Sequence, residues 1–204
     1  NLTNCNIFAQ LSSCKYVRGK VRIILGDLVM DITTTLVSKS TGGVIGNNDS
    51  YGQKISADGR YVAYYSSASN LVAGDTNAAQ DVFITDTTTG ETSLASVAIG
   101  GAPGNGASVA SVALSLDGRY VVYTSLATNL VAGDTNGQKD IFLYDTENQS
   151  TLRINIGVGN TQSAGTFDTD MSLSFDNKYV AYSVYADDLV AGDTNNSNDI
   201  FIYN

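Results

Sequence analysis

The fold is decided by a ten-residue stretch, SADGRYVAYY at residues 56–65, that occurs three times in the chain. It returns as SLDGRYVVYT at residues 115–124 and as SFDNKYVAYS at residues 174–183. Its aspartates are at positions 58, 117 and 176, so both intervals are 59 residues. A fixed period that turn residues and apolar residues share indicates a repeat architecture.

Each repeat predicts four short β-strands. In the first repeat we place them at residues 53–56, 61–66, 81–86 and 91–97. The Asp58-Gly59 pair favours a hairpin between the first two strands, because both residues tolerate the left-handed backbone of a tight turn. The second strand is dense in apolar and aromatic residues, as a strand buried on both faces should be. With no helical stretch, the repeats predict an all-β fold of four-stranded antiparallel meanders.

Four-stranded meanders repeated around an axis are the blades of β-propellers. The motif Ser-x-Asp-Gly-Arg-Tyr-Val-Ala-Tyr resembles the WD40-like (PD40) repeat of the TolB-type β-propellers, over about residues 51–204. In its last copy Asn177-Lys178 replace Gly-Arg, and Asn tolerates the same turn geometry. The resemblance implies a propeller, usually of more blades than this chain supplies. It implies no single function, because one fold hosts many.

We expect one domain over residues 1–204, because the links between repeats are too short to be domain linkers. It would hold about four blades: a degenerate blade at 1–40, full blades at 51–98 and 108–156, and an incomplete blade at 168–204. The degenerate blade rests on an alignment of residues 11–17 with residues 173–180, and of residues 27–31 and 36–38 with the third and fourth strands. Terminal repeats are often atypical because they cap the array.

The last blade lacks its fourth strand, because the chain ends at Asn204 within the third. An open sheet edge carries unpaired N–H and C=O groups and is rarely left uncovered. Three explanations stay open: closure by the N-terminal segment of the same chain, a chain that is cut short, or a strand from a neighbouring copy. The last is β-strand addition, which generates oligomers or fibres. Only residues 1–6 precede the first expected strand, which is short for self-closure.

Net charge is −9 and is unevenly distributed. Residues 1–50 carry five basic and three acidic side chains (+2), and residues 51–204 carry six basic and seventeen acidic ones (−11). The difference is either an ordinary surface fluctuation or a basic end that faces the acidic end of the next subunit. An acidic surface argues against nucleic acid and anionic membranes as partners. No apolar run is long enough to span a bilayer.

A second motif, Gly-Asp-Thr-Asn-x-x-x-Asp, occurs at residues 74–81, 133–140 and 192–199. Its oxygen-bearing side chains match the front half of a calcium loop, although it lacks the Gly and the closing Glu of an EF-hand. The alternative is an Asx-turn that caps the entry to the third strand. We predict structural calcium, which would offset the ordering entropy of a long connection. The predicted ligands are Asp75, Asn77, Asp81, Asp134, Asn136, Asp140, Asp193, Asn195, Ser197 and Asp199.

The sequence offers little for catalysis. It has no histidine, which excludes His-dependent triads and zinc–histidine sites. The pairs Asp187-Asp188 and Asp168/Asp170 could act as acid and base, but we expect them to face solvent in loops. The tyrosines recur at repeat-equivalent positions, so core packing explains them before ligand stacking does.

The chain begins at Asn1 rather than Met, which suggests a processed chain and favours export, to the cell surface, the medium or the periplasm. An exported protein with two cysteines favours a Cys5–Cys14 disulfide. If both lay on one extended strand, they would be about 30 Å apart and out of reach. Both alternatives stay open.

These observations predict a non-enzymatic, calcium-stabilised extracellular structural protein that assembles head-to-tail with copies of itself. The open last blade would accept a strand from a neighbour. The alternative is a β-propeller binding module for a peptide, a glycan or a protein. A third possibility is the non-catalytic half of an enzyme, which requires a catalytic domain outside these 204 residues.

Overall fold

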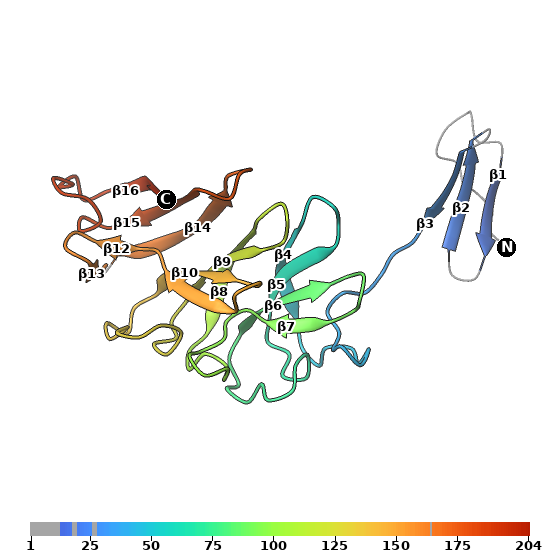
Figure 1. Cartoon of the computed structure of the whole chain (residues 1–204), viewed down its shortest axis with the longest axis horizontal. Helices are drawn as coiled ribbons and strands as arrows, with labels where there is room; N and C mark the ends of the chain where they lie inside the picture. The colour runs from blue at the N-terminus through green and yellow to red at the C-terminus, as the bar shows by residue number, and fades with distance from the viewer. Residues whose placement is uncertain (1–12, 18–19, 26–27, 164) are drawn as a thin grey trace. The chain divides into compact units, whose positions relative to one another are not determined.

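The computed structural model describes residues 13–17, 20–25, 28–163 and 165–204 (Figure 1). The fold is all-β, as predicted, and antiparallel throughout. The described part of the chain has no helix, and hence none that could cross a membrane. The chain groups into two compact units, residues 1–36 and 37–204, where the sequence led us to expect one domain.

The larger unit contains three meander sheets, each with its strands in chain order. The first sheet comprises β4 (Ser50–Ile55), β5 (Tyr61–Ser66), β6 (Asp81–Asp86) and β7 (Thr92–Leu94). The middle sheet comprises β8 (Ser108–Leu114), β9 (Tyr120–Ser125), β10 (Asp140–Asp145) and β11 (Ser150–Arg153). The last sheet comprises β14 (Thr166–Leu173), β15 (Val180–Tyr185) and β16 (Asn198–Tyr203). The four-stranded repeat is therefore confirmed, and β5 and β6 have the predicted bounds.

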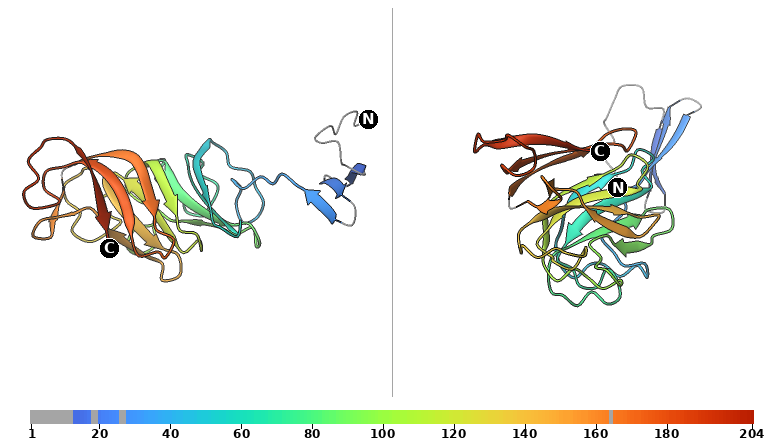
Figure 2. Two further views of the ribbon diagram at one scale, coloured as in Figure 1. Left: turned by 90° about the horizontal axis from the view of Figure 1, so that it is seen from above. Right: turned by 60° about the vertical axis from the view of Figure 1, so that its left-hand side comes forward.

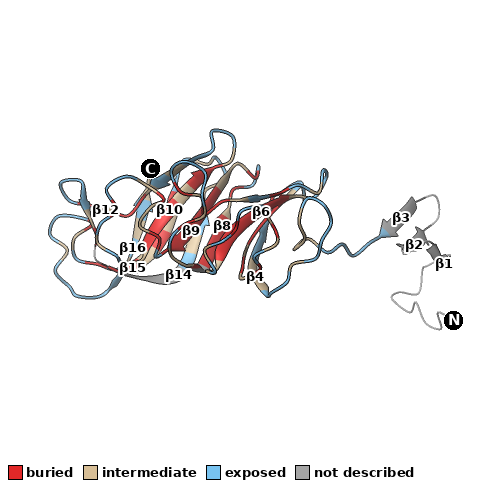
Figure 3. Cartoon of the chain, turned by 90° about the horizontal axis from the view of Figure 1, so that it is seen from below, coloured by how far each residue is buried: buried red, intermediate tan, exposed pale blue. Residues whose placement is uncertain are grey.

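The middle sheet lies between the other two and is buried on both faces (Figures 1, 2 and 3). Alternate residues of a strand point to opposite faces of the sheet. On one face Tyr123 and Phe142 therefore pack with Val82 of the first sheet. On the other face Ile141 packs with Val184 of the last sheet. This two-sided burial explains why the third strand of the repeat is almost continuously apolar.

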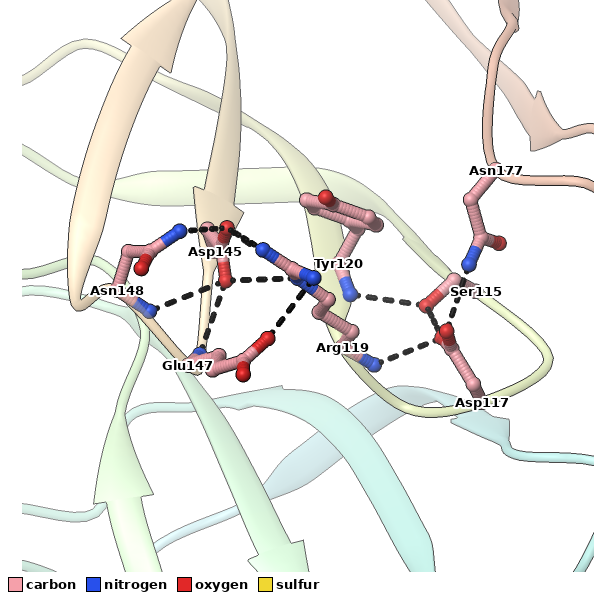
Figure 4. Close-up of polar contacts among 8 residues, drawn as sticks. All are labelled: Ser115, Asp117, Arg119, Tyr120, Asp145, Glu147, Asn148 and Asn177. Carbon is pink, nitrogen blue, oxygen red and sulfur yellow. Dashed lines mark hydrogen bonds and ion pairs between the residues drawn. The ribbon is translucent and has the colours of Figure 1, made fainter.

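The repeated stretch forms a hydrogen-bonded hairpin turn that is tied to the third strand (Figure 4). The Asp117 carboxylate accepts hydrogen bonds from the Ser115 hydroxyl (2.6 Å) and from the Arg119 backbone N–H (3.0 Å). The Ser115 hydroxyl accepts another from the Tyr120 backbone N–H (2.8 Å). The Arg119 guanidinium binds the Asp145 carboxylate at the end of β10, with Nη2 at 2.8 Å from Oδ2. The motif is therefore explained by the turn it builds.

The links between the sheets also repeat. Each is a small hairpin, closed by Lys39 with Ile45, by Val97 with Pro103, and by β12 (Ile156–Gly157) with β13 (Thr161–Gln162). The second and third of these links follow the fourth strands β7 and β11, and the first follows residues 33–38, which form no strand. The links therefore provide a second way to align the repeats, independent of the hairpin motif.

The smaller unit is a three-stranded sheet of β1 (Ser13–Val17), β2 (Lys20–Leu25) and β3 (Leu28–Ile32). The predicted alignment of this region is wrong in two places. Aligning residues 11–17 with residues 173–180 places Cys14 at the hairpin turn of the repeat, but Cys14 lies inside β1 and pairs with Ile23 of β2. The fourth strand expected at residues 36–38 is not formed.

The physical reason for the missing fourth strand is a missing turn. Residues 87–91 join β6 to β7, which allows the chain to fold back on itself. Almost no residues separate the end of β3 at Ile32 from residues 34–38, so that segment runs on from β3 instead of returning along it. Cys5 lies outside the described residues, so the Cys5–Cys14 disulfide stays an open alternative.

Candidate functional site

The first Gly-Asp-Thr-Asn loop connects β5 to β6 and brings two carboxylates into the interior. Asp75 and Asp81 are 8% and 0% exposed. The Asp81 carboxylate accepts hydrogen bonds from the Ser96 hydroxyl (2.7 Å) and the Asn77 side-chain amide (2.7 Å). Burial, which disfavours the charged form, raises the pKa of Asp81 to about 6 and also raises the pKa of Asp75.

The middle loop has the same carboxylates but a different neighbour. Burial raises the pKa of Asp140 to about 6, and Asn155 donates a hydrogen bond to Oδ1 of this residue. The Arg153 guanidinium lies 3.7 Å from Asp134 and 3.8 Å from Asp140. Arg153 occupies the position that Leu94 has one period earlier. This repeat therefore supplies its own buried cation to the carboxylate pair.

The last loop is incomplete. Asp193 and Asp199 are half-buried, whereas their counterparts in the other two loops are buried. Asn195 donates a hydrogen bond from its amide to Asp199 Oδ2 (2.9 Å). The side chains corresponding to Ser96 and Asn155 follow the fourth strand, and the last sheet has only three strands.

The Asx-turn alternative describes the geometry of all three loops. The side-chain oxygens of the motif asparagines accept a hydrogen bond from the backbone N–H two residues on, at 2.9–3.0 Å; the pairs are Asn77 with Ala79, Asn136 with Gln138, and Asn195 with Ser197. No group of three or more acidic, histidine or cysteine side chains that could hold a metal occurs among the described residues. Calcium would take two carboxylates per loop and complete its shell from carbonyl groups and water. The calcium sites stay a prediction.

Three residues of these sites were not predicted from the sequence: Ser96, Asn155 and Arg153. The 59-residue period contains the signal, since it relates Ser96 to Asn155 and Leu94 to Arg153. Ser and Asn share a hydrogen-bonding role here but not a shape, so the relation is hard to see before the sheets are known.

The last sheet exposes a face that the other sheets bury; we call Tyr179, Ile200 and Ile202 the outer face. Ile200 and Ile202 are 80% and 69% exposed. Their counterparts two periods earlier, Val82 and Ile84, are 1% and 7% exposed because the middle sheet covers them. Among the described residues no strand pairs with the free edge of β16. The outer face is therefore an apolar surface with the pattern of an inter-sheet contact.

A groove of about 730 Å³ lies between the first and middle sheets at their hairpin turns. Its charged side chains bind one another: Arg60 pairs with Asp86 (2.8 Å), and Arg119 pairs with Asp145 and Glu147 (both 2.8 Å). These ion pairs hold the hairpin turns of the two sheets in place. The packing of adjacent repeats is therefore enough to explain the groove.

The stacked meanders define an all-β repeat protein whose sheets have the topology of β-propeller blades. No family model matches the sequence, and no curated protein matches it. Among solved structures, the putative TolB from Agrobacterium tumefaciens is 17% identical with a TM-score of 0.48, over 90% of this chain and 60% of that one.

TolB from Acinetobacter baumannii is 16% identical with a TM-score of 0.44, over 88% of this chain and 36% of that one. The tricorn protease is 16% identical with a TM-score of 0.42, over 84% of this chain and 18% of that one. This chain thus spans less than two thirds of the length of each protein.

Proposed function

We propose that the protein is a non-enzymatic structural subunit that assembles head-to-tail with copies of itself through its last sheet. One observation carries the proposal. Ile200 and Ile202 are 80% and 69% exposed at positions that the preceding repeats bury against the next sheet. Fully burying such a side chain is worth roughly 1.5–3 kcal/mol, so a copy that covers both gains substantially from contact.

The opposite end of the array offers a complementary surface. Ile55 in β4 is 63% exposed, whereas Leu114, one period later, packs against the first sheet. Among the described residues of the larger unit, no sheet covers β4 as the first sheet covers β8. The charge distribution, +2 over residues 1–50 and −11 over residues 51–204, favours contact between unlike ends. A second copy that places Ile55 against the outer face would therefore cover apolar side chains of both copies.

The proposal includes calcium in the first and last loops, since Arg153 already lies beside the carboxylates of the middle loop. It also includes a location outside the cytoplasm, in the medium, at the cell surface or in the periplasm. Calcium would neutralise the buried carboxylates, and free calcium is abundant outside cells, where modules of millimolar affinity function. An assembly surface of this kind needs no catalytic group.

The test is the mass in solution as a function of protein concentration, by light scattering with negative-stain imaging. We expect wild-type protein to form regular assemblies. Ile200→Asp should leave monomers, because a charge would be buried at the contact. The matched control is Ile99→Asp, at a side chain that is 68% exposed in the link after the first sheet, which should assemble like wild type. Wild-type protein that stays monomeric at the highest concentration would refute the proposal.

The alternative function is a binding module for a peptide, a glycan or another protein, and the groove between the first and middle sheets is the observation that favours it. A monomer that binds such a ligand, with binding weakened by substitution of Tyr61 in the groove, would support this function instead.

A further inference from the structure

Residues 34–38 have the sequence and the attachment of a fourth strand. At an interval of 58 residues, one less than the period of the other repeats, Thr34, Leu36 and Ser38 correspond to Thr92, Leu94 and Ser96. The latter three belong to β7 and the residues after it. Each segment leads into a link hairpin of the same kind, closed at Lys39 in one case and at Val97 in the other.

The backbone confirms this equivalence. Gly46 donates a hydrogen bond from its N–H to the Ser38 carbonyl at 3.0 Å, and Gly104 donates the same bond to Ser96 at 3.0 Å. Ser38 is therefore the structural counterpart of Ser96, fixed by the hairpin that follows it.

This segment belongs to none of the sheets among the described residues. Residues 33–37 form no strand, and residues 33–36 are exposed, with Leu36 at 49%. Two of the described sheets have only three strands, that of β1, β2 and β3 and that of β14, β15 and β16. The segment continues from β3 without a turn and so does not return along it, which leaves the edge of β16 at the other end of the array. One part of the chain thus has a strand without a sheet, and another has a sheet without that strand.

Resting on the self-assembly proposed above, we propose that residues 34–38 of one copy form the fourth strand of the last sheet of another copy. The register follows from the other two sheets, where Phe83 pairs with Leu94 and Phe142 pairs with Arg153. Phe201 is the next member of that series, and it pairs with Leu36 of the incoming copy.

This register also completes the third carboxylate loop. In the first sheet the Ser96 hydroxyl donates to Asp81 (2.7 Å) and accepts from the backbone N–H of Val82 (3.0 Å). Ser38 of the incoming copy makes the same two bonds, to Asp199 and from the backbone N–H of Ile200. The half-buried carboxylate of Asp199 is thereby enclosed as its counterparts are.

The donor strand comes from another copy because Val37, one of its residues, holds it on the first sheet, away from the last sheet of its own chain. Val37 packs on the first sheet against Val62, Tyr64 and Phe83. The whole middle sheet separates that cluster from β16 (Figure 2). When residues 34–38 pair with β16 of another copy, Val37 keeps them attached to the first sheet of the donor. The donor's first sheet is thereby brought onto the outer face of the acceptor. One docking event therefore fills the edge of β16 and covers Ile200 and Ile202.

Cysteine cross-linking tests the register. Ile84 pairs with Ser93 in the first sheet, so Ile202 should pair with Thr35 of the incoming copy. Cα atoms of such cross-strand pairs lie about 4.5–5.5 Å apart, within disulfide reach. Thr35→Cys and Ile202→Cys are made separately in a Cys5→Ser, Cys14→Ser background, mixed and oxidised. We expect a disulfide between the two chains, and none when Ile99→Cys replaces Ile202→Cys.

A charge in the donor strand provides the second arm. Leu36→Asp should abolish assembly without unfolding the monomer, because Leu36 is half-exposed in the monomer and would be surrounded by apolar side chains in the assembly. Val44→Asp, at a side chain that is 59% exposed in the neighbouring link, is the matched control and should assemble.

The outcomes separate this inference from the proposed function. Wild-type protein that never assembles refutes the function itself. The donor strand alone is refuted by assemblies that Ile200→Asp abolishes but that form equally with Leu36→Asp, and in which Thr35→Cys and Ile202→Cys form no disulfide with each other. A disulfide within single chains carrying both cysteines would place the strand in its own molecule and would also overturn the inference.

Discussion

At the scale of single residues, Ser96 and Asn155 donate the same hydrogen bond to buried carboxylates, although their side chains differ. The Asp of the motif could be predicted from the sequence, because three copies share it. Its partners could not, since they lie 15 residues downstream and reach the carboxylate only after the fourth strand folds back. The same holds for Arg153, whose aliphatic counterpart Leu94 gives no hint of an ion pair.

The buried carboxylates should make the fold more stable in mild acid. Burial raises the pKa of Asp81 and Asp140 to about 6, from 3.8 in the unfolded chain, so the folded state binds more protons between these values. The free energy of unfolding therefore rises as the pH falls from 7.5 to 5, by about 1 kcal/mol for each group. Carboxylates with lowered pKa, such as Asp145 at about 2, lose their contribution only below about pH 4.

Urea denaturation at the two pH values measures this effect. Asp81→Asn should remove about half of the gain, because an amide does not titrate, whereas Asp49→Asn, at an exposed carboxyl, should leave it intact. A free energy of unfolding that falls steadily between pH 7.5 and 5 in the wild type would contradict the predicted role of these carboxylates.

Calcium should stabilise the first loop and leave the middle one unaffected. The first loop has two buried carboxylates, and the uncharged Leu94 stands at the repeat position of Arg153. Millimolar calcium should therefore raise the melting temperature, and a chelator should reverse the change. Asp75→Asn should reduce the shift. Asp134→Asn should not, because Arg153 already neutralises that site. Equal shifts with calcium and magnesium, or no shift in the wild type, would leave the loops as Asx-turns alone.

At the scale of elements, the hairpins and third strands could be predicted closely, because turn residues and buried strands have strong local signals. The second and third strands, β5 and β6, have the bounds expected from the sequence. The N-terminal sheet could not, because its sequence lacks the Asp-Gly signal of the other repeats and its alignment relied on apolar residues that match in several registers. The fourth strand expected at residues 36–38 does not form in the chain itself, because a match in sequence to a fourth strand does not supply the turn that would bring the segment back along β3.

The glycine of the hairpin turn should matter more where another sheet lies beside it. Gly59 and Gly118 have the same left-handed backbone, with φ of 76° and 79°. An added Cβ at Gly118 would lie 2.2 Å from the Tyr61 ring of the first sheet, whereas at Gly59 it would meet nothing within 4 Å. Gly59→Ala should cost about 1 kcal/mol through backbone strain alone, and Gly118→Ala distinctly more.

Denaturant midpoints of these two variants measure the difference, which isolates the contact between sheets from the conformational preference of the turn. Equal losses of stability would mean that the Tyr61 ring moves aside freely, and the packing of the first sheet on the middle one would then be loose at the turns.

At the scale of the whole molecule, the sheets form a stack in which each one depends on its neighbours. The middle sheet is covered on both faces and the last sheet on one. In such arrays stability is approximately a sum of the stabilities of the repeats and of the interfaces between neighbours. The 59-residue period predicts this arrangement. What lies beyond the outer face does not follow from the period, because a terminal repeat has the same sequence pattern whether its next neighbour is a sheet of the same chain or of another copy.

Hydrogen exchange should follow that order and should respond to assembly. In dilute protein the amides of β9 and β10 should exchange slowest and those of β16 much faster, because β16 has a free edge and an exposed face. At assembly concentrations the amides of β16 and of residues 34–38 should become protected together, since one docking event orders both. In Ile200→Asp, which stays monomeric, neither should change. Protection of β16 without protection of residues 34–38 would mean that copies stack on the outer face and leave the edge of the sheet open.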